Sequence, residues 1–221
     1  MYNNITYLYL YNLVFSFIFI FILDHYIKVF GFKGTWFQLH FAINFIIVLY
    51  TYQDVIDCLE NPNNSTLQIT PNTITASSMC FILHMYHTIF YDLRPIDIFH
   101  HYLFIFTSIP LYLMYMNKGA ALVYFFSSGL PGGIDYLLLT LVKNNKINRL
   151  TEKNINSYLN VYIRMSGGYI TSYIIFKDGL QNTTIYMYSN ILLSCLIFYN
   201  SGYFGKLAIE NNIENRLLSN H

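Results

Sequence analysis

Histidines are concentrated in two short stretches of an otherwise apolar sequence. His84 and His87 are three positions apart, and His100 directly precedes His101. Residues three apart share one face of a helix, so the first pair can act together. Imidazoles can transfer protons, accept acyl groups, bind metals or hydrogen-bond a ligand. Because polar side chains in apolar spans are costly and often functional, both pairs are candidate site residues.

Three kinds of chemistry could use these histidines. The first is metal binding, since the spacing resembles the histidine boxes of membrane di-iron oxidases; those boxes need more histidines than the 7 in this chain, so we predict no metal site and no cofactor. The second is acyl transfer from acyl-CoA, with an imidazole as base and Asp135 orienting it. The third is binding, in which Asp135, Arg164 and the imidazoles hydrogen-bond a lipid head group and catalyse nothing.

The composition is that of a membrane protein. Of the 221 residues, 55% are hydrophobic and only 10% are charged, against about 25% charged in a soluble domain. The net charge of +1 provides no basic excess for nucleic acid. The 3 cysteines are far apart and form neither a disulfide framework nor a zinc-binding spacing. We therefore expect membrane lipids as partners and no nucleic acid; the sequence specifies no protein partner.

Apolar segments long enough to cross a membrane recur along the chain and predict an all-α protein with about seven transmembrane helices. The predicted spans are Ile5–Leu23, Trp36–Tyr52, Asn72–Tyr91, Ile96–Met116, Ala120–Val142, Tyr158–Phe176 and Thr184–Phe204. The connections are too short for a soluble domain. We divide the chain into an N-terminal anchor helix with its loop (1–35), a membrane domain (36–204) and a cytosolic tail (205–221).

Two of these spans carry local signals. Pro95 and Asp97 suit the first turn of a helix, which then presents His100 and His101 one turn later. The fifth span contains the sequence Gly-Leu-Pro-Gly-Gly at 129–133, which weakens a helix. The sequence leaves open a plain kink or a half-helix that lines a ligand cavity.

The distribution of basic residues predicts the topology. Nine of the 12 Lys and Arg residues fall on one side of the predicted spans: Lys28, Lys33, Arg94, Lys143, Lys146, Arg149, Lys153, Lys206 and Arg216. Only Lys118 and Lys177 fall on the other side. Cytosolic loops carry the excess of Lys and Arg, so we expect a luminal N-terminus and a cytosolic C-terminus. Glycosylation sequons that begin at Asn63 and Asn64 fall on the luminal side.

This topology places the polar side chains of five helices at a similar depth. With a rise of about 1.5 Å per residue, each lies within the cytosolic half of its span. The residues are His40, His84, His87, His100, His101, Asp135 and Arg164. Their shared depth predicts one polar cavity that binds lipid.

Seven spans, an Arg- and Asp-bearing turn before His100-His101, and a polar, Gly-interrupted next span resemble the TLC-domain family. That family is named for translocation-associated, longevity-assurance and ceroid-lipofuscinosis membrane proteins. The resemblance covers 36–204. It implies a six-helix barrel around a lipid-accessible tunnel, with the first helix as an added anchor. Members include ceramide synthases, in which the matching histidine pair is catalytic, and non-enzymatic proteins that tune lipid composition or cargo export.

The resemblance to the ceramide synthases is incomplete. Those enzymes carry His-Asp-x-x-Asp-x-x-Leu-Glu in the next span. Aligning Asp135 with the second Asp keeps Leu138, but Pro131 and Gly132 replace His-Asp and Leu139 replaces Glu. We therefore expect a lipid-binding protein that controls membrane lipid composition, in the endoplasmic reticulum and without ceramide synthase activity. The alternatives are a lipid acyltransferase that uses His100 or His101, and a membrane cargo receptor.

Overall fold

The computed structural model is all-α, as expected, and describes residues 2–31, 33–62, 69–107, 118–181 and 184–219. Several elements follow one another without a gap, so the described chain forms seven helical segments. These are α1 (Tyr2–Val29); α2 (Thr35–Glu60); α3 (Pro71–Phe90); α4 (Pro95–His100) with the π-helical η2 (His101–Ile105); α6 (Ala120–Val123), η3 (Tyr124–Gly129) and α7 (Leu130–Lys143); α8 (Arg149–Leu159), η4 (Asn160–Met165) and α9 (Ser166–Leu180); and α10 (Thr184–Ser219).

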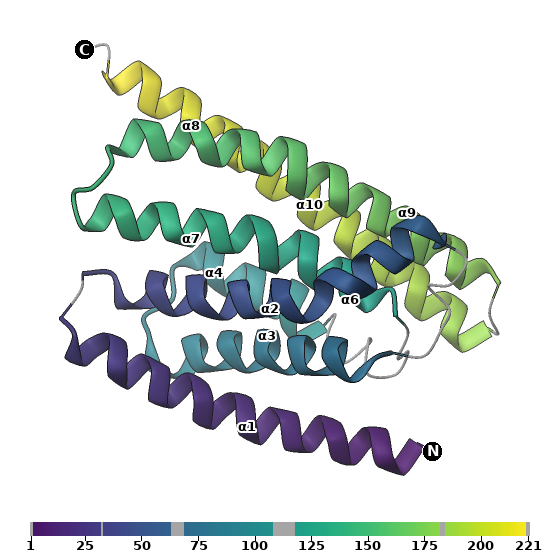
Figure 1. The fold of residues 1–221 in the computed structure, drawn as a ribbon. Helices are drawn as coiled ribbons and strands as arrows, with labels where there is room; N and C mark the ends of the chain where they lie inside the picture. The colour runs from purple at the N-terminus through teal and green to yellow at the C-terminus, as the bar shows by residue number, and fades with distance from the viewer. Residues whose placement is uncertain (1, 32, 63–68, 108–117, 182–183, 220–221) are drawn as a thin grey trace.

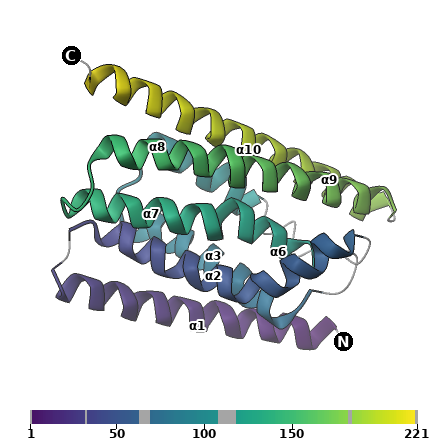
Figure 2. The same cartoon turned by 45° about the horizontal axis from the view of Figure 1, so that its top comes forward.

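The helices form an elongated antiparallel bundle (Figure 1). α1 lies at one edge and packs on α2 and α3, whereas α10 lies at the opposite edge against α8 and α9 (Figures 1 and 2). α7 packs on α2 and also contacts α8, which joins the two groups. The end of α1, the start of α2 and the α7–α8 turn lie at the same end of the bundle as the C-terminus (Figure 1).

Four helices of the described chain are long and apolar enough to cross a membrane. They are Tyr7–Val29, Thr35–Glu60, Ala120–Lys143 and Ile185–Ser219. Large apolar side chains cover the outside of these helices; Tyr11, for example, is 69% exposed and Phe198 is 56% exposed. An exposed apolar surface of this extent is stable against acyl chains and not against water. The chain therefore has the structure of a multi-pass membrane protein.

Short-range capping explains where the helices begin. The Thr70 hydroxyl accepts the backbone N–H of Thr73 at 3.2 Å, one residue before α3. At α4, Pro95 occupies the first turn as expected, and the Asp97 carboxylate accepts the backbone N–H of Arg94 at 3.1 Å. The Asp97 carboxylate also receives two hydrogen bonds of 2.9 Å from the Arg94 guanidinium. These contacts set the register of α4 and hence the position of the two adjacent histidines.

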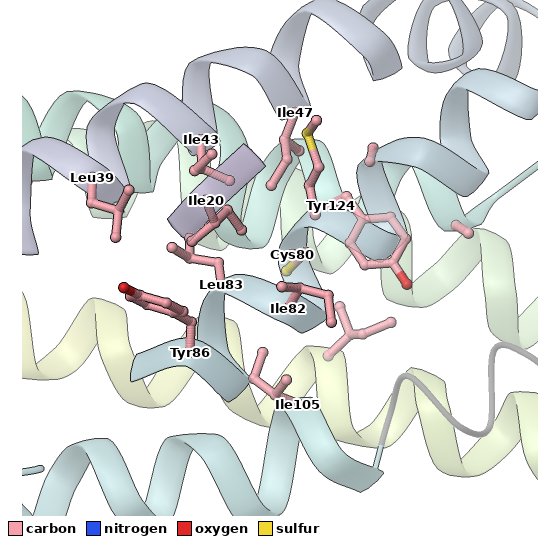
Figure 3. Packing of buried hydrophobic residues seen from close by; sticks show 14 of the residues in the cluster. Ile20, Leu39, Ile43, Ile47, Cys80, Ile82, Leu83, Tyr86, Ile105 and Tyr124 are labelled. Carbon is pink, nitrogen blue, oxygen red and sulfur yellow. The ribbon is translucent and has the colours of Figure 1, made fainter. Parts of the chain in front are cut away.

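The main hydrophobic core is centred on α1, α2 and α3 and extends to η2, α6, η3, α9 and α10 (Figure 3). Ile20 from α1 and Ile43 from α2 are fully buried there beside Leu83 from α3. One buried carboxylate adds a polar link: Asp24 accepts hydrogen bonds from Lys28 at 2.6 Å and from the Tyr86 hydroxyl at 2.7 Å. Because Asp24 is on α1 and Tyr86 is on α3, this link holds the first helix against the rest of the bundle.

The Gly-Leu-Pro-Gly-Gly sequence produces a π-helical turn inside a continuous rod. The backbone N–H of Leu130 reaches the carbonyl of Phe125, five residues back, immediately before Pro131. Pro131 has no N–H and cannot donate a helical hydrogen bond, and the π-turn changes the hydrogen-bond register just before it. Gly132 allows close helix packing, because a Cβ there would lie 2.8 Å from Nδ2 of Asn44 on α2. The segment is therefore not divided into two half-helices.

Two predicted helix boundaries differ most from the structure. The sixth predicted span starts at Tyr158, but α8 begins at Arg149; the seventh ends at Phe204, but α10 continues to Ser219. Both extensions are polar, so hydropathy did not reveal them. They support each other through a 3.0 Å hydrogen bond from Asn212 to Ser157. Residues 108–116 of the fourth predicted span, and the sequons at Asn63 and Asn64, lie outside the described residues.

Small residues allow α9 and α10 to pack closely. A Cβ placed on Gly168 would lie 2.7 Å from Cβ of Ser201, and one on Gly179 would lie 2.8 Å from Cβ of Asn190. Real Cβ atoms essentially never approach this closely. Close backbone approach at small residues is a main source of helix association in membranes, where no hydrophobic effect drives the helices together.

We expect Gly168→Ala to destabilise the bundle by about 1–3 kcal/mol, the usual range for overpacking. The matched control is Gly133→Ala on α7, because a Cβ there would lie 3.6 Å from the nearest atom, an ordinary contact. Thermal unfolding of both variants in mild detergent measures the difference. Equal midpoints for the two variants would contradict the close packing of α9 on α10.

Candidate functional site

One cavity of about 550 Å³ lies inside the bundle. Its described walls come from α2, α3, α4 with η2, α6–η3–α7, α8 with η4, and α10, and include no described residue of α1. The structure brings all the predicted site residues to this cavity: His40, His84, His87, His100, His101, Asp135 and Arg164. What the cavity binds stays a prediction.

The cavity opens at one end and has apolar side chains deeper in, beside Ser127 and Ser128. The exposed residues Asp92, Arg94 and Asn211 line the end near the α3–α4 turn, so the cavity opens there. Ile105 and Ile197 line it further along their helices, away from that opening. Such a space suits a molecule with a polar head and an apolar tail, and its volume is within the usual range of about 300–1,000 Å³ for ligand sites.

Hydrogen bonds orient two of the histidines. Nδ1 of His84 is 2.7 Å from the backbone carbonyl of Cys80, which can only accept, so this nitrogen carries the proton. The Thr88 hydroxyl donates to the carbonyl of His84 at 2.8 Å, which leaves its oxygen to accept from Nδ1 of His101 at 2.9 Å. In the neutral form, Nε2 of both rings is therefore the acceptor. Each of these imidazoles can accept a hydrogen bond from a ligand.

The other imidazoles belong to an aromatic cluster near the cavity opening. The ring of Trp36 stacks on His87, with centroids 3.6 Å apart, and meets the edge of His40 at 3.8 Å. Both nitrogens of His40 and Nδ1 of His87 are buried and have no hydrogen-bond partner among the described residues. His100 faces α10 and packs against Phe204, with centroids 5.2 Å apart. Ring packing holds these side chains in place and leaves the His40 nitrogens unsatisfied.

Asp135 and Arg164 differ from the other charged residues that line the cavity. Arg94 is paired with Asp97 at 2.9 Å, and Lys153 is paired with the buried Glu152 at 3.1 Å. In contrast, Oδ1 of Asp135 and Nε of Arg164 are buried without a hydrogen-bond partner in the described part of the chain. A buried group without a partner costs about 1–3 kcal/mol, and more when it is charged. Both groups are therefore available to water or to a ligand in the cavity.

π-Helical turns are a feature of this cavity that the sequence did not predict. Each of the three contributes polar lining residues: His101 from η2, Ser127 and Ser128 from η3, and Asn160 and Arg164 from η4. Single π-turns often occur at functional sites, because they turn a side chain out of the regular helical register. No sequence signal predicts η2 or η4, whereas the proline that follows η3 could have predicted an irregular turn there.

Sequence reasoning also missed several uncharged lining residues. These include Trp36, Tyr136, Asn160 and Asn200. Asn160 and Asn200 are 3% and 7% exposed, and each has a side-chain oxygen without a partner among the described residues. The rule that singled out the histidines, a polar side chain within an apolar span, would have found both asparagines had it been extended to amides.

The fold and the site define a helical membrane protein with an amphipathic interior cavity. Within the described residues, no group of three His, Cys, Asp or Glu side chains is arranged to hold a metal ion. Comparisons with protein-family models, curated proteins and solved structures found no match for this chain. The resemblance to the TLC-domain family therefore stays a prediction.

We expect Asn200→Cys to react with a water-soluble thiol reagent and Phe198→Cys to resist it. Both lie on α10, but Asn200 lines the cavity whereas Phe198 is on the outer apolar surface. The background lacks the native Cys58, Cys80 and Cys195. Mass spectrometry of the intact protein in lipid nanodiscs measures the modification. Equal labelling of the two cysteines would contradict a water-accessible cavity.

Proposed function

We propose that this protein binds a membrane lipid in the cavity and thereby controls membrane lipid composition. The observation that carries the proposal is the convergence of seven polar side chains, from five predicted spans, on one cavity with an apolar inner end. Each of these side chains would be costly alone in a lipid environment. A lipid whose head meets the polar groups and whose tail fills the apolar end would satisfy the whole arrangement.

We also propose that all seven helical segments cross the membrane. The described residues of three of them do not meet the criteria of length and apolarity that the other four meet. For α3 the reason is its position: it buries polar residues such as Thr73, Ser78 and His84 inside the bundle. A helix shielded by its neighbours can cross a membrane with a lower mean hydropathy, because its polar groups do not face lipid.

The basic residues support one orientation in an endomembrane, which we take to be the endoplasmic reticulum. The end of α1, the start of α2 and the α7–α8 turn lie together with the C-terminus at one end of the bundle (Figure 1). The positive-inside rule makes this end cytosolic and the N-terminus luminal. The cavity then opens toward the cytosol and extends into the membrane. This arrangement and the histidine pair agree with the proposed relationship to the TLC-domain family.

The second candidate function is acyl transfer from acyl-CoA. Its supporting observation is that His101 has Nδ1 engaged by Thr88 and therefore presents Nε2 as a possible base. Its weakness is that the hydrogen bonds that orient His84 and His101 within the described residues go to the Cys80 carbonyl and to Thr88, and not to a carboxylate. We favour binding without turnover for this reason.

We expect Lys146→Cys to be labelled from the cytosolic side only. Lys146 follows α7, at the end of the bundle assigned to the cytosol. Lys177→Cys, near the end of α9, is the matched control and should be labelled only from the lumen. An impermeant thiol reagent added to sealed and to opened vesicles measures both. Labelling of Lys146→Cys from the lumen would reverse the proposed orientation.

We expect lipid to co-purify with the protein in mild detergent, and expect mass spectrometry to detect it. The matched pair of variants is Asn200→Leu, which fills the cavity wall with a branched apolar group, and Phe198→Leu on the outer face of the same helix. The first variant should retain less lipid than the second. The absence of any bound lipid from the unmodified protein would contradict the proposal.

We expect no ceramide from protein incubated in nanodiscs with a sphingoid base and acyl-CoA. N-acylation needs a base for the attacking nitrogen and an acid for the leaving thiol, and each typically contributes about 10²–10⁴-fold. Time-dependent N-acylation that is lost in both His100→Ala and His101→Ala would overturn this expectation and favour the acyltransferase. Chromatography of the reaction products measures the outcome.

A further inference from the structure

The wall of the cavity contains one half-buried arginine, Arg164, that forms no ion pair with any described residue. Arg94 and Lys153 each form an ion pair, at 2.9 and 3.1 Å. Arg164 is the remaining basic residue of the wall, and its Nε is buried without a partner among the described residues. A guanidinium presents a planar fork of donors that matches a phosphate or a carboxylate. The guanidinium of Arg164 is therefore available to bind an anion.

The same wall also contains hydrogen-bond acceptors that remain open. Oδ1 of Asp135 is buried and has no partner within the described chain. His84 and His101 engage Nδ1 and present Nε2 as an acceptor when neutral. A simple anion would satisfy Arg164 but would be repelled by Asp135 and would leave the imidazole acceptors unmet. A ligand must therefore supply N–H or O–H donors next to its anion.

We infer, on the basis of the proposed lipid binding, that the cavity takes a head group combining an anion for Arg164 with an N–H or O–H donor for Asp135. A phosphoethanolamine head group has this combination, because its phosphate is an acceptor and its ammonium is a donor. A quaternary ammonium has the same charge but no N–H, so it satisfies Asp135 less well. A plain alcohol has a donor but no anion for Arg164.

The alkyl chain attached to this head group would lie against apolar side chains deeper in the cavity. Ile105, Val123 and Ile197 line the cavity beyond the histidines, on three different helical segments. These apolar side chains lie next to the polar part of the cavity. A single alkyl chain placed against them would bury its apolar surface away from water, which is favourable. The head group then lies toward the cytosolic opening and the tail toward the middle of the bundle.

Three single-chain probes test this inference: hexadecylphosphoethanolamine, hexadecylphosphocholine and hexadecanol. They share one tail and differ in the head group. Trp36 is the only tryptophan and lines the cavity, so its fluorescence reports binding to the purified full chain in a neutral detergent. We expect the phosphoethanolamine to bind about 10- to 100-fold more tightly than hexadecanol, the effect of one charged hydrogen-bonded contact.

Substitutions assign that preference to individual residues. Arg164→Gln should remove the advantage of both phosphate probes and leave the affinity for hexadecanol unchanged, which also shows that the variant is folded. Asp135→Asn should abolish the difference between the ethanolamine and choline probes. The control is Arg149→Gln, an equivalent charge removal at the start of α8 and outside the cavity, which should change none of the affinities.

The possible failures are distinguishable. Equal binding of all three probes to the unmodified protein would overturn the head-group inference and leave lipid binding intact. Binding of none of them would contradict lipid binding itself. If inorganic phosphate binds as tightly as the lipid probe, the ligand of the site is a free anion and the lipid inference is wrong. If Arg164→Gln also fails to bind hexadecanol, the variant Arg164→Lys is tested instead. An unchanged affinity of Arg164→Lys for the phosphoethanolamine probe would contradict a specific contact with the guanidinium.

Discussion

The arrangement of this protein follows from the need to keep polar side chains away from lipid. Inside a bilayer no water satisfies a stray donor or acceptor, so polar groups are stable only against one another, a cavity or a ligand. Asp24 meets this need with hydrogen bonds to Lys28 and Tyr86. Asp135 and Arg164 meet it only partly, because each keeps a buried atom without a partner among the described residues. The first arrangement is structural, and the second is the basis of the proposed binding site.

The same constraint explains how the walls of the cavity are built. Regular helices present side chains at fixed intervals, but three π-turns change that interval where His101, Ser128 and Arg164 line the cavity. Small residues allow other helices to approach closely, as Gly132 does against Asn44. Close helix packing and π-helical turns thus occur together at the wall of a cavity of about 550 Å³ within an otherwise packed bundle.

The histidines illustrate how one residue type serves two purposes in this wall. His84 and His101 have their tautomers set by a backbone carbonyl and a threonine hydroxyl, so each offers a defined acceptor in its neutral form. His40 and His87 pack against Trp36 and act more as aromatic surface. A polar chamber with defined acceptors and the guanidinium of Arg164 would suit the proposed recognition of a lipid head group.

The sequence by itself determined the all-α class, the approximate positions of the helices and seven of the charged or imidazole residues that line the cavity, because a long apolar run and a polar side chain within it are both local signals. It did not reveal that α8 starts at Arg149 or that α10 extends to Ser219, since polar helix extensions depend on packing between distant segments such as Ser157 and Asn212. Only the tertiary structure decided which charges find partners. Arg94 pairs with a residue three positions away, whereas the surroundings of Arg164 come from helices far apart in the chain. No local pattern can show that its Nε has no partner among the residues that the structure describes.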